Sequence, residues 1–282
     1  MKKTLRKIGM FLPAKVVVHI DYARSYKKIL NLKKPAYYGE KIQWIKIYGN
    51  LERYGKYVDK YEVREFINQK LGEGYFPKLL GVYDNAEEID FDKLPDKFVI
   101  KMTNGTGGNI ICKDKSNINI EETIKKLSKW KKEKIYKYTK ENQYKNVKSR
   151  IICEEYLEDE TGSLTDYKLH CFNGKVEMVE IHRDRYTDHK ENYYDVDWNE
   201  YGVICKVKKG PDMKRPENLN EMIKIAEKLS QTFVYVRVDL YSVQGKIYFG
   251  ELTFTPANGT DPLYPLEKDL EFGSLINLDS YY

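Results

Sequence analysis

Two carboxylates stand in neighbouring strand-like segments near the end of the chain. The runs 236–241 and 247–253 are rich in β-branched and aromatic residues, and the polar, glycine-containing stretch between them predicts a β-hairpin. If the loop covers residues 244–246, Asp239 lies directly opposite Glu251 on one face of the hairpin. Two like charges at that separation repel each other unless a cation lies between them. The pair therefore predicts a Mg²⁺ site, with the ion shared with substrate phosphates.

The same hairpin has a simpler interpretation. With that loop Tyr241 faces Phe249, and one of the two carboxylates forms a surface ion pair with Arg237 or Lys246. The hairpin alone leaves both interpretations open.

A glycine-rich segment is the second chemical signal. The strand-like run 98–102 is followed by Asn-Gly-Thr-Gly-Gly-Asn at 104–109 and by a second strand-like run at 110–112. Glycines let backbone N–H groups approach phosphate closely. No Gly-Lys-Ser/Thr ends the loop and no helix follows it, which excludes a P-loop. Lys101, a lysine in an apolar strand, favours a lid over a triphosphate; the alternative is a plain hairpin turn.

Composition and charge limit the class of protein. The 282 residues carry a net charge of +6, which suits an anionic partner such as ATP, an acidic polysaccharide or nucleic acid. A basic stretch at 131–150 makes a polyanion-binding protein one alternative, although such runs are usually solvated surfaces. The four cysteines lack paired spacing, which indicates free thiols in a cytoplasmic protein. The four histidines show no metal-ligand pattern, so the sequence predicts no zinc site.

The order of predicted elements indicates an α+β fold with antiparallel hairpins. We divide the chain into a helical N-terminal segment at 1–58, a helix–strand connector at 59–95, a small lobe at 96–158 and a large lobe at 159–282. Expected helices are 26–30, 40–48, 60–71 with Asp59 as N-cap, 121–135 and 219–232. Expected strands include a short one within 75–83 and a hairpin of 166–172 with 176–181, followed by a loop over 184–202.

The first twenty residues are basic and partly apolar. Their apolar run is too short for a signal peptide, and Pro13 and Lys15 interrupt it. No window has the length that a transmembrane helix needs. We expect an ordinary terminal helix; peripheral contact with an anionic membrane at the inner face is the alternative.

The chain resembles the ATP-grasp superfamily and, more closely, the teichuronopeptide-biosynthesis (TupA)-like ATP-grasp family. The resemblance covers nearly the whole chain. It rests on blocks in the right order at 35–44, 59–65, 98–108, 166–174 and 250–259.

The resemblance implies a fold of two antiparallel-sheet subdomains that clamp ATP, with the short helical segment in place of the usual N-terminal α/β domain. It also implies site residues. Lys101 and Lys168 would contact phosphates under a lid of Gly105, Thr106, Gly107 and Gly108. The hinge Glu154, Glu155, Tyr156 and Leu157 would read adenine, and Glu158, Asp159 or Glu160 the ribose. Asp239 and Glu251 would hold Mg²⁺, and Arg183, Arg185 and Arg237 would contact the transferring phosphoryl group or a substrate carboxylate.

One departure from the family pattern concerns the metal site. Many members have Asn two residues after the metal-binding Glu, where this chain has Thr253. Asn258 or water would then complete the metal shell.

The implied activity is an ATP- and Mg²⁺-dependent carboxylate–amine ligase that works through an acylphosphate. It would join an amino acid or simple amine to a uronic or other acidic sugar of a capsule or cell-wall glycan, with no nucleic-acid partner. The alternative on the same scaffold is a sugar kinase or glycosyltransferase-like enzyme of polysaccharide biosynthesis.

Overall fold

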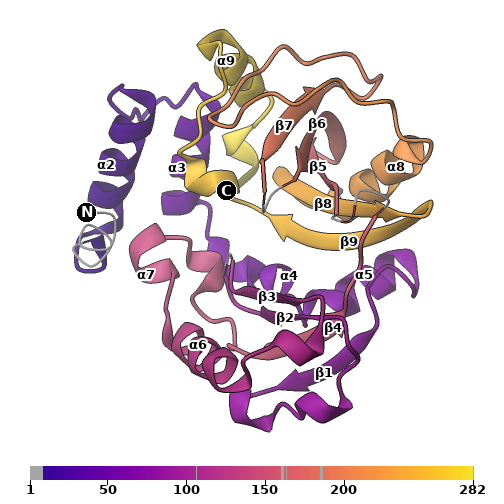
Figure 1. The fold of residues 1–282 in the computed structure, drawn as a ribbon. Helices are drawn as coiled ribbons and strands as arrows, with labels where there is room; N and C mark the ends of the chain where they lie inside the picture. Colours follow the sequence, from indigo (N-terminus) through magenta and orange to yellow (C-terminus); the bar gives the residue numbers. More distant parts are fainter. Residues whose placement is uncertain (1–8, 106, 160–161, 163, 185–186, 282) are drawn as a thin grey trace.

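Two antiparallel sheets, one from each half of the chain, form the framework of the computed structural model (Figure 1). The structure describes residues 9–105, 107–159, 162, 164–184 and 187–281. The mixed α+β class and the two antiparallel sheets agree with the sequence prediction. Within the described residues, no helix has the length and apolar character that crossing a bilayer requires.

The small sheet has four strands in the order β1-β4-β2-β3. Helix α6 (Ile120–Lys132) packs against β2 and is capped by Asn119, whose side chain accepts a hydrogen bond from the Glu122 N–H. The predicted connector is therefore not separate from this sheet, because its strand β1 pairs with β4. The strands are β1 Leu79–Tyr83, β2 Phe98–Met102, β3 Asn109–Cys112 and β4 Ile151–Glu155.

The large sheet has five strands in the order β7-β6-β5-β8-β9, and helix α8 (Leu219–Ser230) packs against β5, β6 and β8. All seven residues of β5 are buried. Since strand side chains alternate, Leu169 and Cys171 face α8, whereas Lys168 and His170 face the other way. That second face is buried and polar. The strands are β5 Asp166–Phe172, β6 Lys175–Arg183, β7 Lys190–Tyr194, β8 Tyr235–Val243 and β9 Lys246–Thr253.

The β8–β9 hairpin confirms the pairing of Asp239 with Glu251 but not the predicted route to it. The turn holds two residues, Gln244 and Gly245, both with positive φ, as a two-residue hairpin turn requires. Tyr241 therefore faces Tyr248 rather than Phe249. A bulge between Asp239 and Leu240, with Gly250 as the extra residue on β9, shifts the register by one residue, so the shorter turn and the extra residue offset each other.

The first part of the chain is helical, as predicted, but some boundaries differ. The segment 26–30 is not a helix, because α2 ends at Tyr26 and Lys27 has left-handed backbone angles. The helix expected from residue 60 starts at Val63, although Asp59 still accepts the Tyr61 N–H as a capping residue does. Strand β7 lies inside the segment predicted as a loop. The helices not yet given are α2 Ala14–Tyr26, α3 Tyr38–Tyr48, α4 Gly55–Val58, α5 Val63–Leu71, α7 Tyr136–Thr139 and α9 Leu266–Ser274.

Short 3₁₀ turns complete the connections between these elements. They are η1 Leu51–Tyr54, η2 Ala86–Glu88, η3 Phe91–Lys93, η4 Lys115–Asn117, η5 Asn142–Tyr144, η6 Pro256–Gly259 and η7 Leu278–Tyr281.

Candidate active site

A cavity of about 1160 Å³ lies between the two sheets. Strands β2 and β4 contribute Lys101 and Glu154 from the small sheet, and β5, β6, β8 and β9 contribute the polar face of the large sheet. Helix α2 forms a further part of the wall. We call this space the central cavity. It gathers charged groups from distant parts of the sequence into one buried place.

The wall formed by the large sheet is a network of paired charges. Asp239 is 2% exposed and accepts two hydrogen bonds from Arg237, Nε to Oδ1 at 2.7 Å and Nη2 to Oδ2 at 2.8 Å. Lys168 Nζ lies 2.5 Å from Asp239 Oδ2 and 3.5 Å from Asp166 Oδ2. Buried charges need such partners, because each alone would lose its hydration without compensation.

Glu251 lines the same cavity but is more open. Its side chain is 36% exposed, with Oε1 at 3.8 Å from Arg237 Nη2 and 3.4 Å from the Thr253 hydroxyl. Burial alone would raise the pKa of Asp239, but Arg237 and Lys168 hold it below its ordinary value. Both carboxylates are thus on one face, as predicted, yet the cations nearest Asp239 are protein side chains. The pairing with Arg237 that the simpler interpretation expected is present for Asp239, but it is buried in the cavity wall and not on the sheet surface.

Lys101 faces the cavity from the small sheet. Its Nζ lies 2.6 Å from Glu154 Oε2, and Arg64 pairs with the other carboxylate oxygen. Burial alone would raise the pKa of Glu154, whereas these two cations lower it. Glu154 therefore fixes the lysine ammonium at the cavity wall.

The glycine segment adopts conformations that other residues avoid. Gly105, Gly107 and Gly108 have φ of 96°, 78° and 71°. A Cβ on Gly105 would come within 2.7 Å of the Ile135 side chain. The Gly105 carbonyl accepts a hydrogen bond from Lys60 Nζ at 2.9 Å. Gly107 lines the central cavity. Thr106 lies outside the described residues.

Comparison with known families decides which class of fold this cavity belongs to. The sequence profile described as TupA-like ATPgrasp matches residues 40–277. The chain belongs to the TupA-like ATP-grasp family. ATP and Mg²⁺ are accordingly its cofactors, as the sequence predicted. A comparison with curated proteins finds no significant match.

Solved structures agree with an ATP-grasp fold. A D-alanine–D-alanine ligase from Bacillus anthracis is 17% identical with a TM-score of 0.50, over 83% of this chain and 76% of that one. The same enzyme complexed with ATP gives 18% and 0.45 over 74% and 62%. A phosphoribosylamine–glycine ligase from Thermotoga maritima gives 14% and 0.43 over 73% and 51%. The chain thus spans less than two thirds of the length of the latter two chains.

The oxygen atoms at the β8–β9 hairpin are of the type that Mg²⁺ prefers, and they face one cavity. Asp239, Glu251 and Thr253 present carboxylate and hydroxyl oxygens to one cavity, and hard divalent cations prefer such ligands. Asn258 lines the cavity too, but its Oδ1 accepts a hydrogen bond from Lys46 Nζ at 2.7 Å. That amide oxygen is engaged by an ammonium, as the Asp239 carboxylate is, and Asn258 as a metal ligand stays a prediction.

The predicted adenine hinge is only partly available. The Glu155 N–H donates to the Lys78 carbonyl at 2.9 Å, and Glu154 lies within the sheet ladder between β1 and β2. Their backbone groups are therefore used by the small sheet. Tyr156 and Leu157 follow the end of β4 and are half-buried, so they remain the predicted adenine contacts.

The acidic candidates for the ribose are partly engaged elsewhere. Glu158 pairs with Lys97 at 2.9 Å, and Asp159 accepts bonds from the Thr165 N–H and hydroxyl. Glu160 lies outside the described residues.

The three candidate arginines separate. Arg237 is in the cavity wall. The Arg183 side chain is on the other face of β6 from Glu180 and His182 and does not line the central cavity. Its Nη2 donates to the Asn192 side chain at 3.0 Å and to the Pro211 carbonyl at 2.8 Å. It anchors the segment after β7, so its prediction as a phosphoryl or carboxylate contact is corrected. Arg185 lies outside the described residues.

Sequence reasoning missed a row of groups beside Arg237. The Glu180 carboxylate lies between His170 and His182 and 3.7 Å from Arg237 Nη1. Glu191 on β7 joins the same wall. A sequence signal did exist in the neighbouring strand β5, where Asp166, Lys168 and His170 alternate with apolar residues.

The prediction with the clearest pH dependence concerns Lys46. Desolvation by burial lowers its pKa from 10.5 to about 8. The unfolded chain therefore binds more protons than the folded one between these values, so folding gains stability as pH rises. We expect wild type to gain about 1.4 kcal/mol per pH unit relative to Lys46→Met in that window. Urea unfolding from pH 7.5 to 10 measures it. Lys125→Met, at an exposed lysine, should show no such trend; a flat difference for Lys46→Met would contradict the burial effect.

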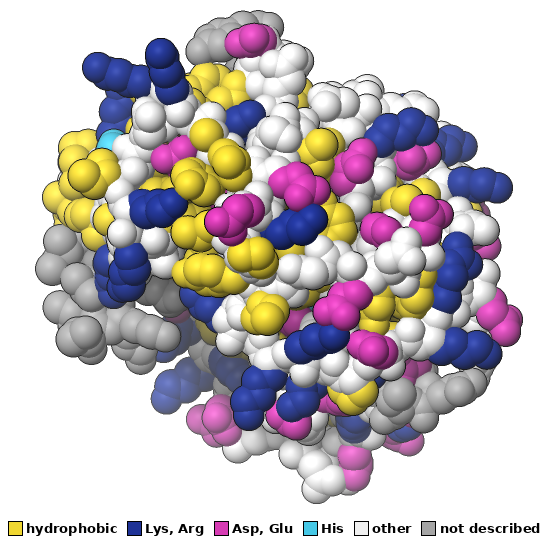
Figure 2. All heavy atoms as spheres, turned by 90° about the horizontal axis from the view of Figure 1, so that it is seen from above, with side chains coloured by type: hydrophobic (Ala, Val, Ile, Leu, Met, Phe, Trp, Pro, Cys, Tyr) yellow, Lys and Arg dark blue, Asp and Glu magenta, His cyan; other side chains and the backbone are white. Residues whose placement is uncertain are grey.

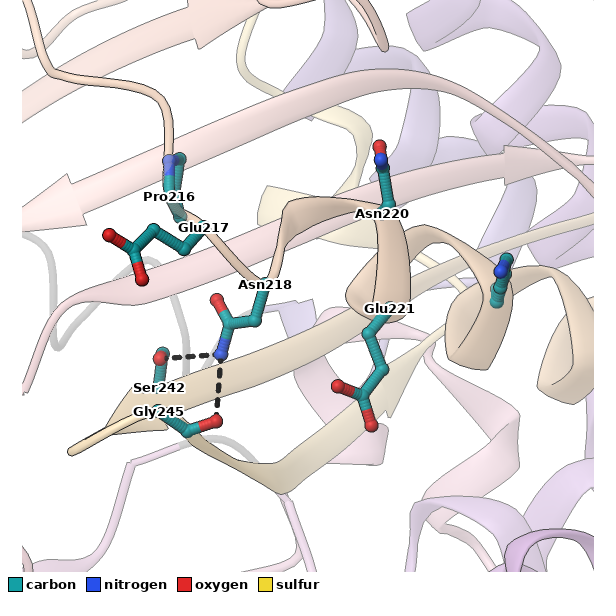
Figure 3. Close-up of a pocket in the computed structure, with 8 residues that line it drawn as sticks. Pro216, Glu217, Asn218, Asn220, Glu221, Ser242 and Gly245 are labelled. Atoms are coloured by element: carbon teal, nitrogen blue, oxygen red, sulfur yellow. Dashed lines mark hydrogen bonds between the residues drawn. The ribbon is translucent and has the colours of Figure 1, made fainter.

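A second hollow lies at the opposite end of the β8–β9 hairpin, beside the start of α8 (Figure 3). Asn218 Nδ2 donates to the Ser242 hydroxyl at 2.8 Å and to the Gly245 carbonyl at 3.3 Å. These bonds attach the hairpin turn to α8. The hollow lacks the paired buried charges of the central cavity, so it is not the candidate active site.

Proposed function

We propose that this chain is an ATP- and Mg²⁺-dependent carboxylate–amine ligase that works through an acylphosphate. The observation that carries the proposal is the pair Asp239 and Glu251, directly opposed on one cavity wall, with Lys101 on the facing sheet. Family membership supports it. Bound Mg²⁺ would neutralise charge on the triphosphate, and the protein would supply positioning.

The reaction consists of two transfers. A substrate carboxylate oxygen attacks the γ-phosphorus of ATP, and ADP leaves, which gives an acylphosphate. An amine nitrogen then attacks the acyl carbon, the C–N bond forms and inorganic phosphate leaves. Lys101 and the glycine segment would hold phosphates, and Lys168 and Arg237 would balance the charge on the reacting groups. No protein nucleophile is needed.

The part of the central cavity next to helix α2 suits an anionic substrate. Arg24 of helix α2 and Lys27, just after the end of that helix, line the central cavity. Within the proposal, the carboxylate belongs to a uronic or other acidic sugar of a capsule or cell-wall glycan, and the amine to an amino acid or simple amine. Peripheral membrane contact through the first residues stays a prediction.

Product analysis tests the ligase proposal. We expect ADP and phosphate to form in equal amounts only when an acidic sugar, such as a UDP-uronic acid, and an amine are both present, with an amide in the product. The same scaffold acting as a sugar kinase would instead leave a phosphoester and release no phosphate. Formation of a phosphoester would therefore overturn the proposal.

The polyanion-binding alternative has less support. Basic side chains of the 131–150 stretch pair with carboxylates: Lys145 with Glu52 at 2.8 Å and Lys148 with Asp84 at 2.9 Å. On the face drawn in Figure 2, basic and acidic side chains are intermixed. Neither feature is typical of the continuous positive surface that binds nucleic acid.

A further inference from the structure

Three side chains with metal-binding atoms converge at the wall of the central cavity, and none of them is a predicted Mg²⁺ ligand. They are His182 at the end of β6, His189 just before β7, and Glu191 on β7. One ligand atom from each can be chosen so that all lie within 4.8 Å of one another. His182 Nδ1 is 2.9 Å from His189 Nε2, and Glu191 Oε1 is 3.6 Å from that same His189 atom. We call these residues the histidine cluster.

The sheet register brings the cluster together. His182 and Glu191 are directly opposed in the β6–β7 pair, so their side chains share a face. His189 precedes Glu191 by two residues and therefore points to the same side of the strand. The spacing of these residues in the sequence does not predict the cluster, because the pairing of β6 with β7 brings them together. The prediction that the histidines bind no metal is thus opened again by the structure.

The groups around the cluster orient it as the outer shell of a metal site does. His182 Nε2 lies 2.5 Å from Glu180 Oε1, and the Tyr193 hydroxyl donates to Glu191 Oε2 at 2.7 Å. Since an ionised carboxylate only accepts hydrogen bonds, the His182 proton lies on Nε2. Its Nδ1 is then the atom directed at His189. A histidine fixed by a carboxylate on its far nitrogen is the usual arrangement of metal-bound imidazole.

Charge gives a second, independent argument. The Glu191 side chain is only 6% exposed. In the part of the chain that the structure describes, its carboxylate has the two histidines, and no lysine or arginine, within ion-pairing distance. Arg237 and Lys168, two cations of the same cavity wall, are engaged by Asp239. The Tyr193 hydroxyl donates a hydrogen bond to this carboxylate but does not neutralise its charge, and a divalent ion would do so.

We propose that His182, His189 and Glu191 bind a divalent transition-metal ion of the Zn²⁺ class. Two imidazole nitrogens and one carboxylate oxygen suit Zn²⁺ and its neighbours, whereas Mg²⁺ prefers oxygen ligands alone. His182 and Glu191 both line the central cavity, so the ion is reachable from it, and a fourth ligand comes from water or a substrate oxygen. The proposal does not depend on the ligase reaction.

Metal titration of the tag-free protein tests the site. Zn²⁺ binding is measured by calorimetry in the presence of millimolar Mg²⁺, and Co²⁺ is followed by its visible absorption. We expect one ion per chain, and an affinity at least about a hundredfold lower in His189→Ala, which loses one of three ligands. His189 is partly exposed, so this variant should fold; circular dichroism checks it. His19→Ala removes an exposed histidine from α2 and should bind as wild type does.

A further variant separates this site from the predicted Mg²⁺ site. Glu251→Gln should keep full Zn²⁺ affinity even if it no longer consumes ATP. The proposal fails if wild type and His189→Ala bind Zn²⁺ equally, or if His19→Ala loses as much affinity as His189→Ala. Failure of ATP turnover with intact Zn²⁺ binding would count against the ligase proposal alone.

Discussion

Replacing Glu251 with Gln should reduce ATP consumption at least about a hundredfold while the protein stays folded. The carboxylate lies opposite Asp239 at the cavity wall, and the amide keeps its shape but not its charge. A metal ion contributes several kcal/mol to phosphoryl transfer, and each 1.36 kcal/mol is tenfold in rate. Because Glu251 is partly exposed and its carboxylate lies 3.8 Å from Arg237 Nη2, the free energy of unfolding should change by less than about 1 kcal/mol. ADP release under saturating Mg²⁺ measures the effect.

The matched control for that result is Glu177→Gln. Glu177 lies on strand β6 of the same sheet, but it is exposed and is not part of the cavity wall. The same chemical change there should leave turnover within about twofold of wild type. Retained turnover in Glu251→Gln would remove Glu251 from the metal site, and with it the central support for the proposed reaction.

The β8–β9 hairpin shows how local sequence can predict a site. Residue type and alternation were enough to place Asp239 and Glu251 on one face, and the glycine segment was found because its φ values require glycine. The pairing was correct although the turn was one residue too long, because the bulge that compensates has no sequence signal that we recognised. The sequence therefore predicted correctly that the two carboxylates share a face of the hairpin, but it did not predict the path of the backbone through the turn and the bulge.

The part of the site that sequence could not predict is made by contacts between strands. Glu180, His182 and Glu191 become neighbours only because β7 pairs with β6, and β7 is a polar edge strand that reads as a loop. Arg183 was chosen for its residue type alone, and the alternation of β6 turns it away from the cavity. Such errors follow from side-chain direction, which depends on where a strand begins.

The N-terminal helices illustrate a second limit. Their helical character was predicted from apolar spacing, whereas their place at the cavity was not, since α2 carries few signals of function. The cavity lining includes Asp21 and Arg24, one helical turn apart. Which face of a helix meets a site depends on packing, here of α2 on α3, and local periodicity does not determine that.

Replacing Asp239 with Asn should cause the largest loss of stability. The change leaves Arg237 and Lys168 buried side by side without the carboxylate that both contact. Removing one member of a buried ion pair costs about 3–5 kcal/mol, because the remaining charges stay desolvated. Urea unfolding at neutral pH measures the loss. Asp212→Asn, at an exposed carboxylate, should change stability by no more than about 0.5 kcal/mol.

A double variant shows whether charge is the cause. Lys168→Met removes one of the two stranded cations, so Asp239→Asn with Lys168→Met should recover part of the loss, with a coupling of about 0.5–3 kcal/mol. The pH dependence gives a second check. Since Arg237 and Lys168 lower the pKa of Asp239, its contribution is present at neutral pH and is lost as pH falls through the folded-state pKa. The gap between wild type and Asp239→Asn should therefore narrow in acid. A gap independent of pH, with no recovery in the double variant, would mean that shape rather than charge holds this wall together.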